Sequence, residues 1–430
     1  MQIHINPPKS GWGELCTRPS SSNDVVAQRV AAIIERVRTS GDKALSELSS
    51  EIDGVTLPAL QVSAEEFAEA EAAVTPEVRQ ALSHALSNIR KFHEAQMPSP
   101  VSLETEPGVR CVQKAVPIRK VGLYIPGGTA PLFSTVLMLA VPAKVAGCSE
   151  VVLCTPVSRQ TGKVAPEVLY AAAICGVDKV FKVGGAQAIA AMAFGTATIP
   201  AVDKIFGPGN QYVTTAKQML GGRQVAIDMP AGPSEVMVLA DATADPAFVA
   251  ADLLSQAEHG SDSQVMLVCD SQQIADAVMS EVKRQSAVLD RQAMVEGALS
   301  KSRAIVFDSR TSREQIVAFA NEYGAEHLII SMAEPWNIAG QITAAGSVFI
   351  GNYSPESAGD YASGTNHTLP TCGWASSCSG VNIDSFMRKI TFQELSEEGL
   401  ARLSDTIVTM AEAEGLAAHA NAVKVRMAKY

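Results

Sequence analysis

The sequence contains no long apolar run and no cluster of basic residues, and these two absences exclude several classes of protein. The richest short apolar run, VLMLAVP at 136–142, is broken by Pro142 and falls far short of the about 20 residues that span a membrane. With 34 basic and 45 acidic residues the net charge is −11, which argues against nucleic acid and anionic membrane surfaces as partners. The N-terminal MQIHINPPKS has no basic region leading into an apolar core, so we expect no secretory signal and a cytoplasmic protein.

Several motifs built on thiols or glycines are also absent. None of the eight cysteines forms a C-x-x-C pair, which argues against a thiolate zinc knuckle, and we interpret them as buried reduced thiols. The patterns G-x-G-x-x-G, Walker A and G-x-S-x-G are missing. Two glycine turns, IPGGTAP and VGGAQAIAA, each follow a predicted strand and open a helix, where free backbone amides suit phosphate. A tight packing turn explains each of them better when they are taken alone.

The chain is long enough for several domains, and its apolar pattern changes along its length. Its 430 residues are 47% hydrophobic and 18% charged, which is typical of a compact protein of roughly two to four domains. Residues 23–95 place apolar side chains at helical spacing and predict helices. From about 119 onward, short β-branched runs alternate with helical ones, first over 119–234 and again over 235–350. This alternation predicts two α/β lobes with parallel, helix-covered sheets.

The last 80 residues depart from this rhythm. Residues 352–381 are rich in serine and glycine, and a loop of this length is usually functional or disordered. Its aromatic residues and His367 favour a functional loop, which we place within 351–385. Helical patterns return over 386–430 and predict a small C-terminal arm.

Histidines are scarce, and four of the seven lie beside Gln, Glu or Asp at element ends or in the long loop. Gln256 and His259 are predicted to lie in the last turn of one helix and on the same face, where they could bind one metal ion. Ordinary helix-end polarity explains this pair better when it is taken alone. Glu326 and His327 open a strand, where a neutral imidazole suits a general base and a carboxylate could activate water. A surface Glu-His pair explains these two residues equally well.

The remaining candidates lie further along the chain. Asp360 stands in the long loop, where its carboxylate could bind Zn²⁺ or could form an Asx turn beside Gly359. Glu414 and His419 are five residues apart on a predicted helix and share a face only if Gly415 breaks it. A lone helical histidine is usually structural. Four side chains would together give a site of nitrogen and oxygen donors with room for substrate: Gln256, His259, Asp360 and His419.

Long blocks of the sequence resemble the histidinol dehydrogenase family. They are VGLYIPGGTAPLFSTVLMLAVPAKVAGC, GGAQAIAAMAFGT, DKIFGPGNQYVTTAK, DMPAGPSEV, SQAEHGSDSQV, GAEHLII, SPESAGDYASGTNHTLPT and EGLAAHANAV, and the likeness runs from about 20 to 427. The resemblance implies a zinc enzyme that oxidises L-histidinol through L-histidinaldehyde to L-histidine with two NAD⁺, the final steps of histidine biosynthesis. It also implies an α/β fold of two incomplete Rossmann-like lobes.

The resemblance also implies how the regions and residues divide the work. Residues 1–118 would be a helical region packing on the 235–350 lobe, which would hold zinc and substrate, while 119–234 would bind NAD. The implied zinc ligands are Gln256, His259, Asp360 and His419. The implied acid/base pair is Glu326, which would activate water, and His327, which would take the alcohol proton. The implied substrate contacts are these ligands, His327, Ser234, His367 and Glu414, and the implied NAD contacts are Tyr124, Gln187 and Asn210. The family forms a homodimer that exchanges its arm, so Glu414 and His419 would serve the other subunit.

Three alternatives remain open at the level of sequence. Relatives of this family oxidise other small amino or sulfonated alcohols on the same frame. A zinc hydrolase would use Glu326 to activate water bound to metal and would need no NAD. A protein that binds an imidazole ligand would use zinc for recognition only.

Overall fold

The computed structural model describes residues 1–430 except 19–23, 128–130, 231 and 429–430. The chain divides into two units: Met1–Gln96 with Ile118–Phe386, and Met97–Pro117 with Met387–Tyr430. Among the described residues, none of the helices combines the length and the apolar character that crossing a membrane requires.

The first unit contains two parallel sheets. The strands of the larger sheet are β1 (Gln2–Ile5), β9 (Glu235–Ala240), β10 (Gln264–Cys269), β11 (Arg303–Val306), β12 (Ala325–Ser331) and β13 (Ala345–Ile350). They lie in the order β1-β11-β10-β9-β12-β13 and pair in parallel throughout. The strands of the smaller sheet are β4 (Lys120–Tyr124), β5 (Glu150–Cys154), β6 (Lys179–Phe181), β7 (Lys204–Phe206) and β8 (Ala226–Ile227). Their order is β6-β5-β4-β7-β8, again all parallel.

Apart from β1 at the edge of the larger sheet, both sheets have the same topology. Counting from β9 or from β4, the order is third, second, first, fourth and fifth strand, which is the Rossmann order without its sixth strand. The prediction of two incomplete Rossmann-like lobes is therefore confirmed.

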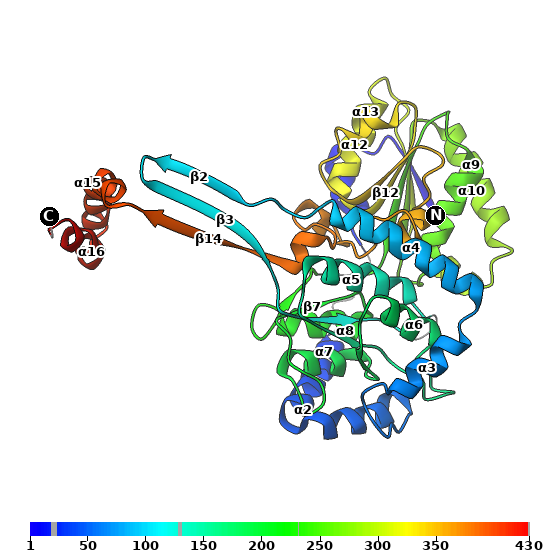
Figure 1. Cartoon of the computed structure of the whole chain (residues 1–430). Helices are drawn as coiled ribbons and strands as arrows, with labels where there is room; N and C mark the ends of the chain where they lie inside the picture. Colours follow the sequence, from blue (N-terminus) through cyan, green and yellow to red (C-terminus); the bar gives the residue numbers. More distant parts are fainter. Residues whose placement is uncertain (19–23, 128–130, 231, 429–430) are drawn as a thin grey trace. The chain divides into compact units, whose positions relative to one another are not determined.

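The larger sheet is covered on both faces. Its helices are α9 (Pro246–Ala257), α10 (Gln272–Ser286), α11 (Gln292–Ser300), α12 (Ser312–Tyr323) and α13 (Pro335–Ala339), with the short α1 (Trp12–Leu15). Figure 1 shows α9 and α10 on one side of β12 and α12 and α13 on the other. Because successive strand residues point to opposite faces, Val236 and Val238 join one core while Met237 and Leu239 join the other. This explains why EVMVLA is a continuous apolar run after its first residue.

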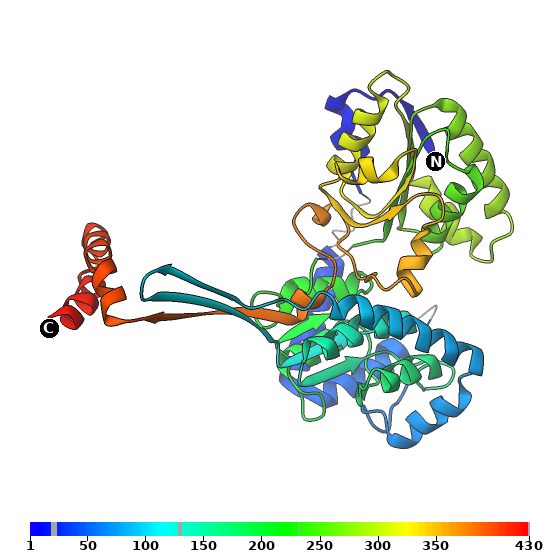
Figure 2. The ribbon, with the colours of Figure 1, turned by 45° about the horizontal axis from the view of Figure 1, so that its top comes forward.

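The N-terminal helices pack on the smaller sheet's lobe. They are α2 (Asp24–Leu48), which bends at Gly41, α3 (Ala64–Ala73) and α4 (Pro76–Glu94), and the lobe's own helices are α5 (Phe133–Ala146), α6 (Pro166–Ile174), α7 (Gly185–Phe194) and α8 (Gln211–Leu220). Helix α2 contacts α7 and α8, α3 contacts α6, and α4 contacts α5. In Figure 2 the long blue helices of residues 24–94 lie beside this lobe, whereas the dark blue first residues lie in the other lobe.

This packing differs from the expected packing of residues 1–118 on the 235–350 lobe. The apolar stripe of α2, including Val26, Val30 and Val37, is buried against the alanine-rich α7, whose small side chains allow close approach. Among the described residues, the first ones of the chain, from β1 through α1 to Arg18, join the 235–350 lobe.

The second unit is not wholly helical, as 1–118 and 386–430 were expected to be. It contains β2 (Val101–Glu106), β3 (Val109–Pro117) and β14 (Met387–Leu395) as an antiparallel sheet in the order β14-β3-β2. Helices α15 (Glu397–Ala413) and α16 (Ala417–Met427) pack on each other. The strands were missed because they bury little: every residue of β2 is exposed.

The eight cysteines are all described and are free thiols. Four of them are buried, including Cys154 and Cys269 in their strands, while Cys372 is exposed. The expectation of buried reduced thiols therefore applies to part of the set.

Candidate functional site

The candidate site lies at the end of the larger sheet where β9 and β12 begin. Helix α9, capped by the Asp245 side chain, ends at Ala257 and delivers Gln256 and His259 to this edge. The Gln256 side-chain nitrogen lies 2.9 Å from Nδ1 of His259. The two side chains therefore face each other, although His259 lies two residues beyond the helix.

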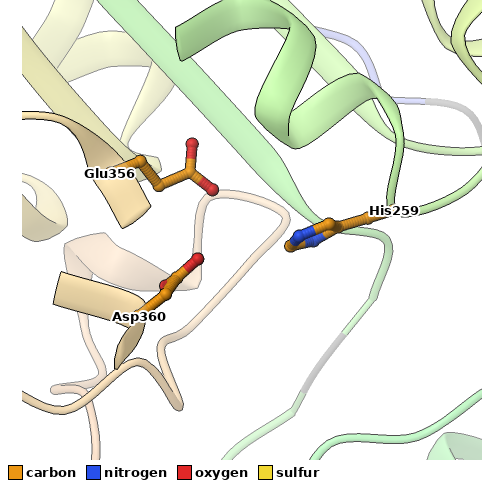
Figure 3. A group of neighbouring side chains, drawn as sticks. All are labelled: His259, Glu356 and Asp360. Atoms are coloured by element: carbon orange, nitrogen blue, oxygen red, sulfur yellow. The ribbon is translucent and has the colours of Figure 1, made fainter. Parts of the chain in front are cut away.

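A short helix inside the long loop brings two carboxylates to the same place. Helix α14 (Glu356–Tyr361) carries Asp360 and, one turn earlier, the buried Glu356. One ligand atom from each of His259, Glu356 and Asp360 lies within 4.8 Å of the others. Figure 3 shows the three side chains pointing toward one space. The alternative of an Asx turn at Asp360 does not describe this helical residue.

Glu326 and His327 lie beside this cluster at the start of β12. Both side chains are buried, with 6% and 4% of the residue exposed. Nδ1 of His327 lies 3.1 Å from the Glu235 carbonyl oxygen, and its Nε2 lies 3.6 Å from Oδ1 of Asp360. A proton on Nδ1, donated to that carbonyl, leaves the Nε2 lone pair facing the cluster.

The electrostatics of this group follow from burial of several acids around one imidazole. Burial raises the pKa of Glu326 and that of Glu356, each to about 8. Burial would lower the pKa of His327, but the carboxylates of Glu356, Glu326 and Asp360 outweigh it and raise that pKa to about 10. Glu326 and Glu356 therefore resist ionisation until a cation joins them, whereas the neighbouring histidines lower the pKa of Asp360 in spite of its burial.

The donor set fits a divalent cation. Within the described part of the chain, the side-chain oxygen of Gln256 and both carboxylate oxygens of Glu356 are buried without a hydrogen-bond partner. Buried acceptors without partners are costly unless something positive meets them. Imidazole, carboxylate and amide donors without thiolate suit zinc and other first-row metal ions.

His367 and Ser234 lie on segments that border the cluster. Nδ1 of His367 lies 2.9 Å from the Asp360 carbonyl oxygen, and its Nε2 lies 3.2 Å from the Thr135 hydroxyl on α5. His367 thus joins the helix of Asp360 to the other lobe. Ser234 directly precedes β9, and its carbonyl accepts a hydrogen bond from the Gln264 amide.

The three residues expected to contact NAD lie in the smaller sheet's lobe. Tyr124 ends β4, and Asn210 caps α8 after β7, the strand next to β4. This is the carboxyl edge at the point where the strand order reverses, the usual nucleotide position in such folds. Gln187 lies in the first turn of α7, where the Gly185 amide donates to the Tyr124 hydroxyl over 3.0 Å. Residues 128–130 of the first glycine turn lie outside the described residues.

Glu414 and His419 belong to the second unit. Gly415, with φ of 75°, separates α15 from α16, so the helix break that the sequence left open is present. Both side chains are exposed.

Sequence reasoning missed Glu356. Its signal was available, because Glu356 and Asp360 are four apart and share a face once SPESAGDY is recognised as a helix rather than a loop. No comparable sequence pattern points to Glu235, whose carbonyl oxygen contacts Nδ1 of His327. It is a single charged residue at the start of an apolar strand.

Comparison with known proteins agrees with this geometry. The family model for histidinol dehydrogenase matches residues 16–427. A histidinol dehydrogenase from Bacteroides fragilis strain YCH46 is 55% identical over 427 residues and 99% of each chain. One from Salmonella typhimurium strain LT2 is 53% identical over 96% of this chain and 94% of its own. The crystal structure of histidinol dehydrogenase from Elizabethkingia anophelis superposes with a TM-score of 0.97 at 50% identity, covering 100% of this chain and 98% of that one. The chain therefore belongs to the histidinol dehydrogenase family, a family of oxidoreductases.

Proposed function

We propose that this chain oxidises L-histidinol to L-histidine with two NAD⁺, in histidine biosynthesis, at a zinc site formed by Gln256, His259 and Asp360. The observation that carries the proposal is the convergence of these three side chains beside Glu326 and His327. The overall reaction consumes one water and two NAD⁺ and yields two NADH and three protons with the carboxylate product. Family membership argues against the hydrolase and the imidazole-binding protein, since neither transfers hydride.

The residues at the start of β12 divide the proton transfers between them. The carboxylates around His327 raise its pKa to about 10 as long as no cation neutralises them. With zinc bound beside it and Nδ1 donating to the Glu235 carbonyl, Nε2 of His327 would be free to take the hydroxyl proton of histidinol as hydride leaves the same carbon for NAD⁺. Glu326 then takes a proton from the water that adds to the aldehyde, and the hydrated aldehyde gives up the second hydride. A carboxylate whose pKa burial raises to about 8 is a stronger base than an exposed one, which suits this role.

Zinc at this site would hold the substrate through its imidazole and amino nitrogens. Tyr124, Gln187 and Asn210 would position NAD at the carboxyl edge of the smaller sheet. Ser234 and His367 would contact the substrate from the segments that border the cluster.

We also propose a homodimer in which the partner subunit's His419 and the partner subunit's Glu414 complete each site. The second unit supports this, because many of its large apolar side chains are exposed, including Leu103, Phe392 and Met410 at 59%, 48% and 60%. Exposed apolar surface of this kind is typical of an interface with another chain.

The test is NADH formation from L-histidinol and NAD⁺ before chelation, after chelation and after zinc is restored. Two NADH per histidinol, lost with the metal and regained with zinc, is the expected result. A folded, zinc-loaded protein that does not turn over histidinol but oxidises another small amino or sulfonated alcohol would redirect the substrate assignment.

A further inference from the structure

Glu235 is a buried carboxylate outside the proposed metal and acid/base groups. Its side chain is 1% exposed at the first position of β9. The Arg18 guanidinium donates to both of its oxygens, over 3.0 Å from Nε and 3.1 Å from Nη2. The Cys372 amide donates to the same carboxylate over 2.8 Å. Glu235 therefore links two distant segments to the start of β9: Arg18, which lies 217 positions earlier, and Cys372 in the long loop.

Arg18 is itself held in place by several contacts. Its guanidinium lies over the Tyr323 ring at 3.7 Å from the centroid and donates to the Tyr323 carbonyl over 2.6 Å. It also donates to the Cys16 carbonyl over 3.1 Å, and 14% of its side chain is exposed. A planar guanidinium that stacks on a ring and binds a carboxylate with two bonds fixes direction as well as charge.

The backbone of Glu235 contacts both proposed acid/base residues. Its amide donates to Oε2 of Glu326 over 2.8 Å, and its carbonyl accepts from Nδ1 of His327 over 3.1 Å. One residue thus orients both side chains, and a shift of its backbone would move both. The Cys372 backbone on its other side has φ of 56°, a conformation that a non-glycine residue keeps only when its surroundings hold it.

We propose that Arg18 and Glu235 are positioning residues for the Glu326–His327 pair. The ion pair fixes the one residue whose amide and carbonyl set the direction of both side chains and the tautomer of the imidazole. The inference rests on the proposed function for the roles of Glu326 and His327, while the geometry of the four residues is independent of substrate.

The experiment compares Arg18→Ala with Arg303→Ala in the full-length enzyme. Arg303 is a matched control because it donates to the Leu15 and Thr17 carbonyls, and so holds the same N-terminal segment without touching Glu235. Arg18→Ala is expected to lower kcat on the order of 10²-fold, the effect of displacing catalytic groups by about 1 Å, with KM for histidinol and NAD⁺ and the bound zinc little changed. Guanidinium ion, added at concentrations well below those that unfold the protein, is expected to restore kcat in Arg18→Ala and not in Arg303→Ala.

Equal losses of kcat in the two variants, or no response to guanidinium, would overturn the inference. If Arg18→Ala does not fold, Arg18→Lys is the second variant, because it keeps the positive charge but cannot donate two parallel hydrogen bonds to Glu235. A wild-type kcat in Arg18→Lys would also overturn the inference. Absence of histidinol-dependent NADH in the wild type would instead count against the proposed function. In that case, ¹⁵N NMR of His327 still tests the inference, because the Nδ1–H tautomer should be lost when Arg18 is replaced and kept when Arg303 is replaced.

Discussion

Glu326 and His327 are adjacent in sequence but are held by different atoms of one neighbour. A strand would direct them to opposite faces, yet near the start of β12 both side chains reach Glu235 on β9. The amide fixes a carboxylate oxygen, and the carbonyl fixes an imidazole nitrogen. The two groups therefore keep separate orientations, which suits two separate proton transfers.

Because Glu326 and His327 are oriented separately, replacing each of them should affect a different step of the reaction. His327→Ala should slow the first oxidation and Glu326→Gln the conversion of aldehyde to acid, each on the order of 10²–10⁴-fold, the usual contribution of a positioned acid or base. Single-turnover rates with histidinol and with histidinaldehyde supplied directly measure the two steps. Equal losses in both steps for Glu326→Gln would contradict the division of roles.

Glu356 should matter for the metal more than for the proton transfers. Both of its buried oxygens lack a hydrogen-bond partner within the described chain, although Oε1 lies 3.9 Å from Nδ1 of His327, and the side chain faces His259 and Asp360. Glu356→Gln keeps the shape but removes the charge, so zinc affinity should fall by about 10–100-fold, as for other groups that support a metal site. Competition with a coloured chelator measures this. Glu258→Gln, next to His259 but outside the cluster, is the control, and an equal loss there would show a general charge effect.

The long loop is anchored as an element by buried hydrogen bonds to the other lobe. The Asn366 side chain donates to the Met138 carbonyl over 2.6 Å and accepts from the Thr368 amide over 3.0 Å. On α4, the buried His93 bonds the Ile89 carbonyl through Nδ1 at 2.8 Å, and its Nε2 lies 3.5 Å from the Asn366 amide nitrogen. His93 must therefore be neutral, with Nε2 accepting, to keep this contact.

The state of His93 predicts a pH dependence of stability. Burial lowers the pKa of His93, so below the unfolded value of about 6.5 the unfolded chain binds a proton that the folded chain does not. The free energy of unfolding should fall as pH drops through this range, by up to about 1.4 kcal/mol per pH unit for one proton, and should not change above it from this cause. Urea unfolding of wild type and His93→Gln between about pH 5 and 8 isolates this contribution. The stability difference between them should shrink toward acid pH, and a constant difference would contradict the assignment.

The elements that the sequence predicted correctly are those whose side chains enter a core. β4, β5, β9 and β10 are short β-branched runs buried on both faces, and such runs are visible in sequence. β14 pairs with β3 across 270 to 286 residues and is mostly exposed, so neither its pairing nor its burial leaves a strong pattern. VSLETE in β2 does alternate, and that weak signal was overlooked.

The candidate site was likewise only partly predictable from the sequence. Gln256, His259 and Asp360 were named from residue types and a family resemblance, whereas Arg18 and Glu235 meet only after the chain has folded, 217 residues apart. Glu356 was hidden because α14 has six residues and lies in a serine- and glycine-rich stretch. Contacts between distant segments depend on the tertiary fold, which residue patterns do not encode locally.

At the scale of the whole molecule, the two lobes use opposite edges of similar sheets. The proposed NAD contacts lie at the carboxyl ends of β4, β6 and β7 in one sheet, whereas the cluster of His259, Glu356 and Asp360 lies where β9 and β12 begin in the other. The bond between Thr135 and His367 joins the two lobes near the cluster. A common fold thus serves two different tasks, because helix ends and loops, not strand order, supply the side chains of each.

The proposed sharing of sites between subunits predicts complementation between two inactive variants. Asp360→Ala would remove a proposed ligand from the first unit, and His419→Ala would remove a proposed ligand from the second unit. In a mixed dimer one site lacks both ligands and the other lacks neither, so a mixture reassembled at random should regain about a quarter of wild-type activity. Each variant alone, taken through the same dissociation and reassembly, is the control. If each chain built its own site, every site in the mixture would lack one ligand, and activity would stay at the level of the separate variants.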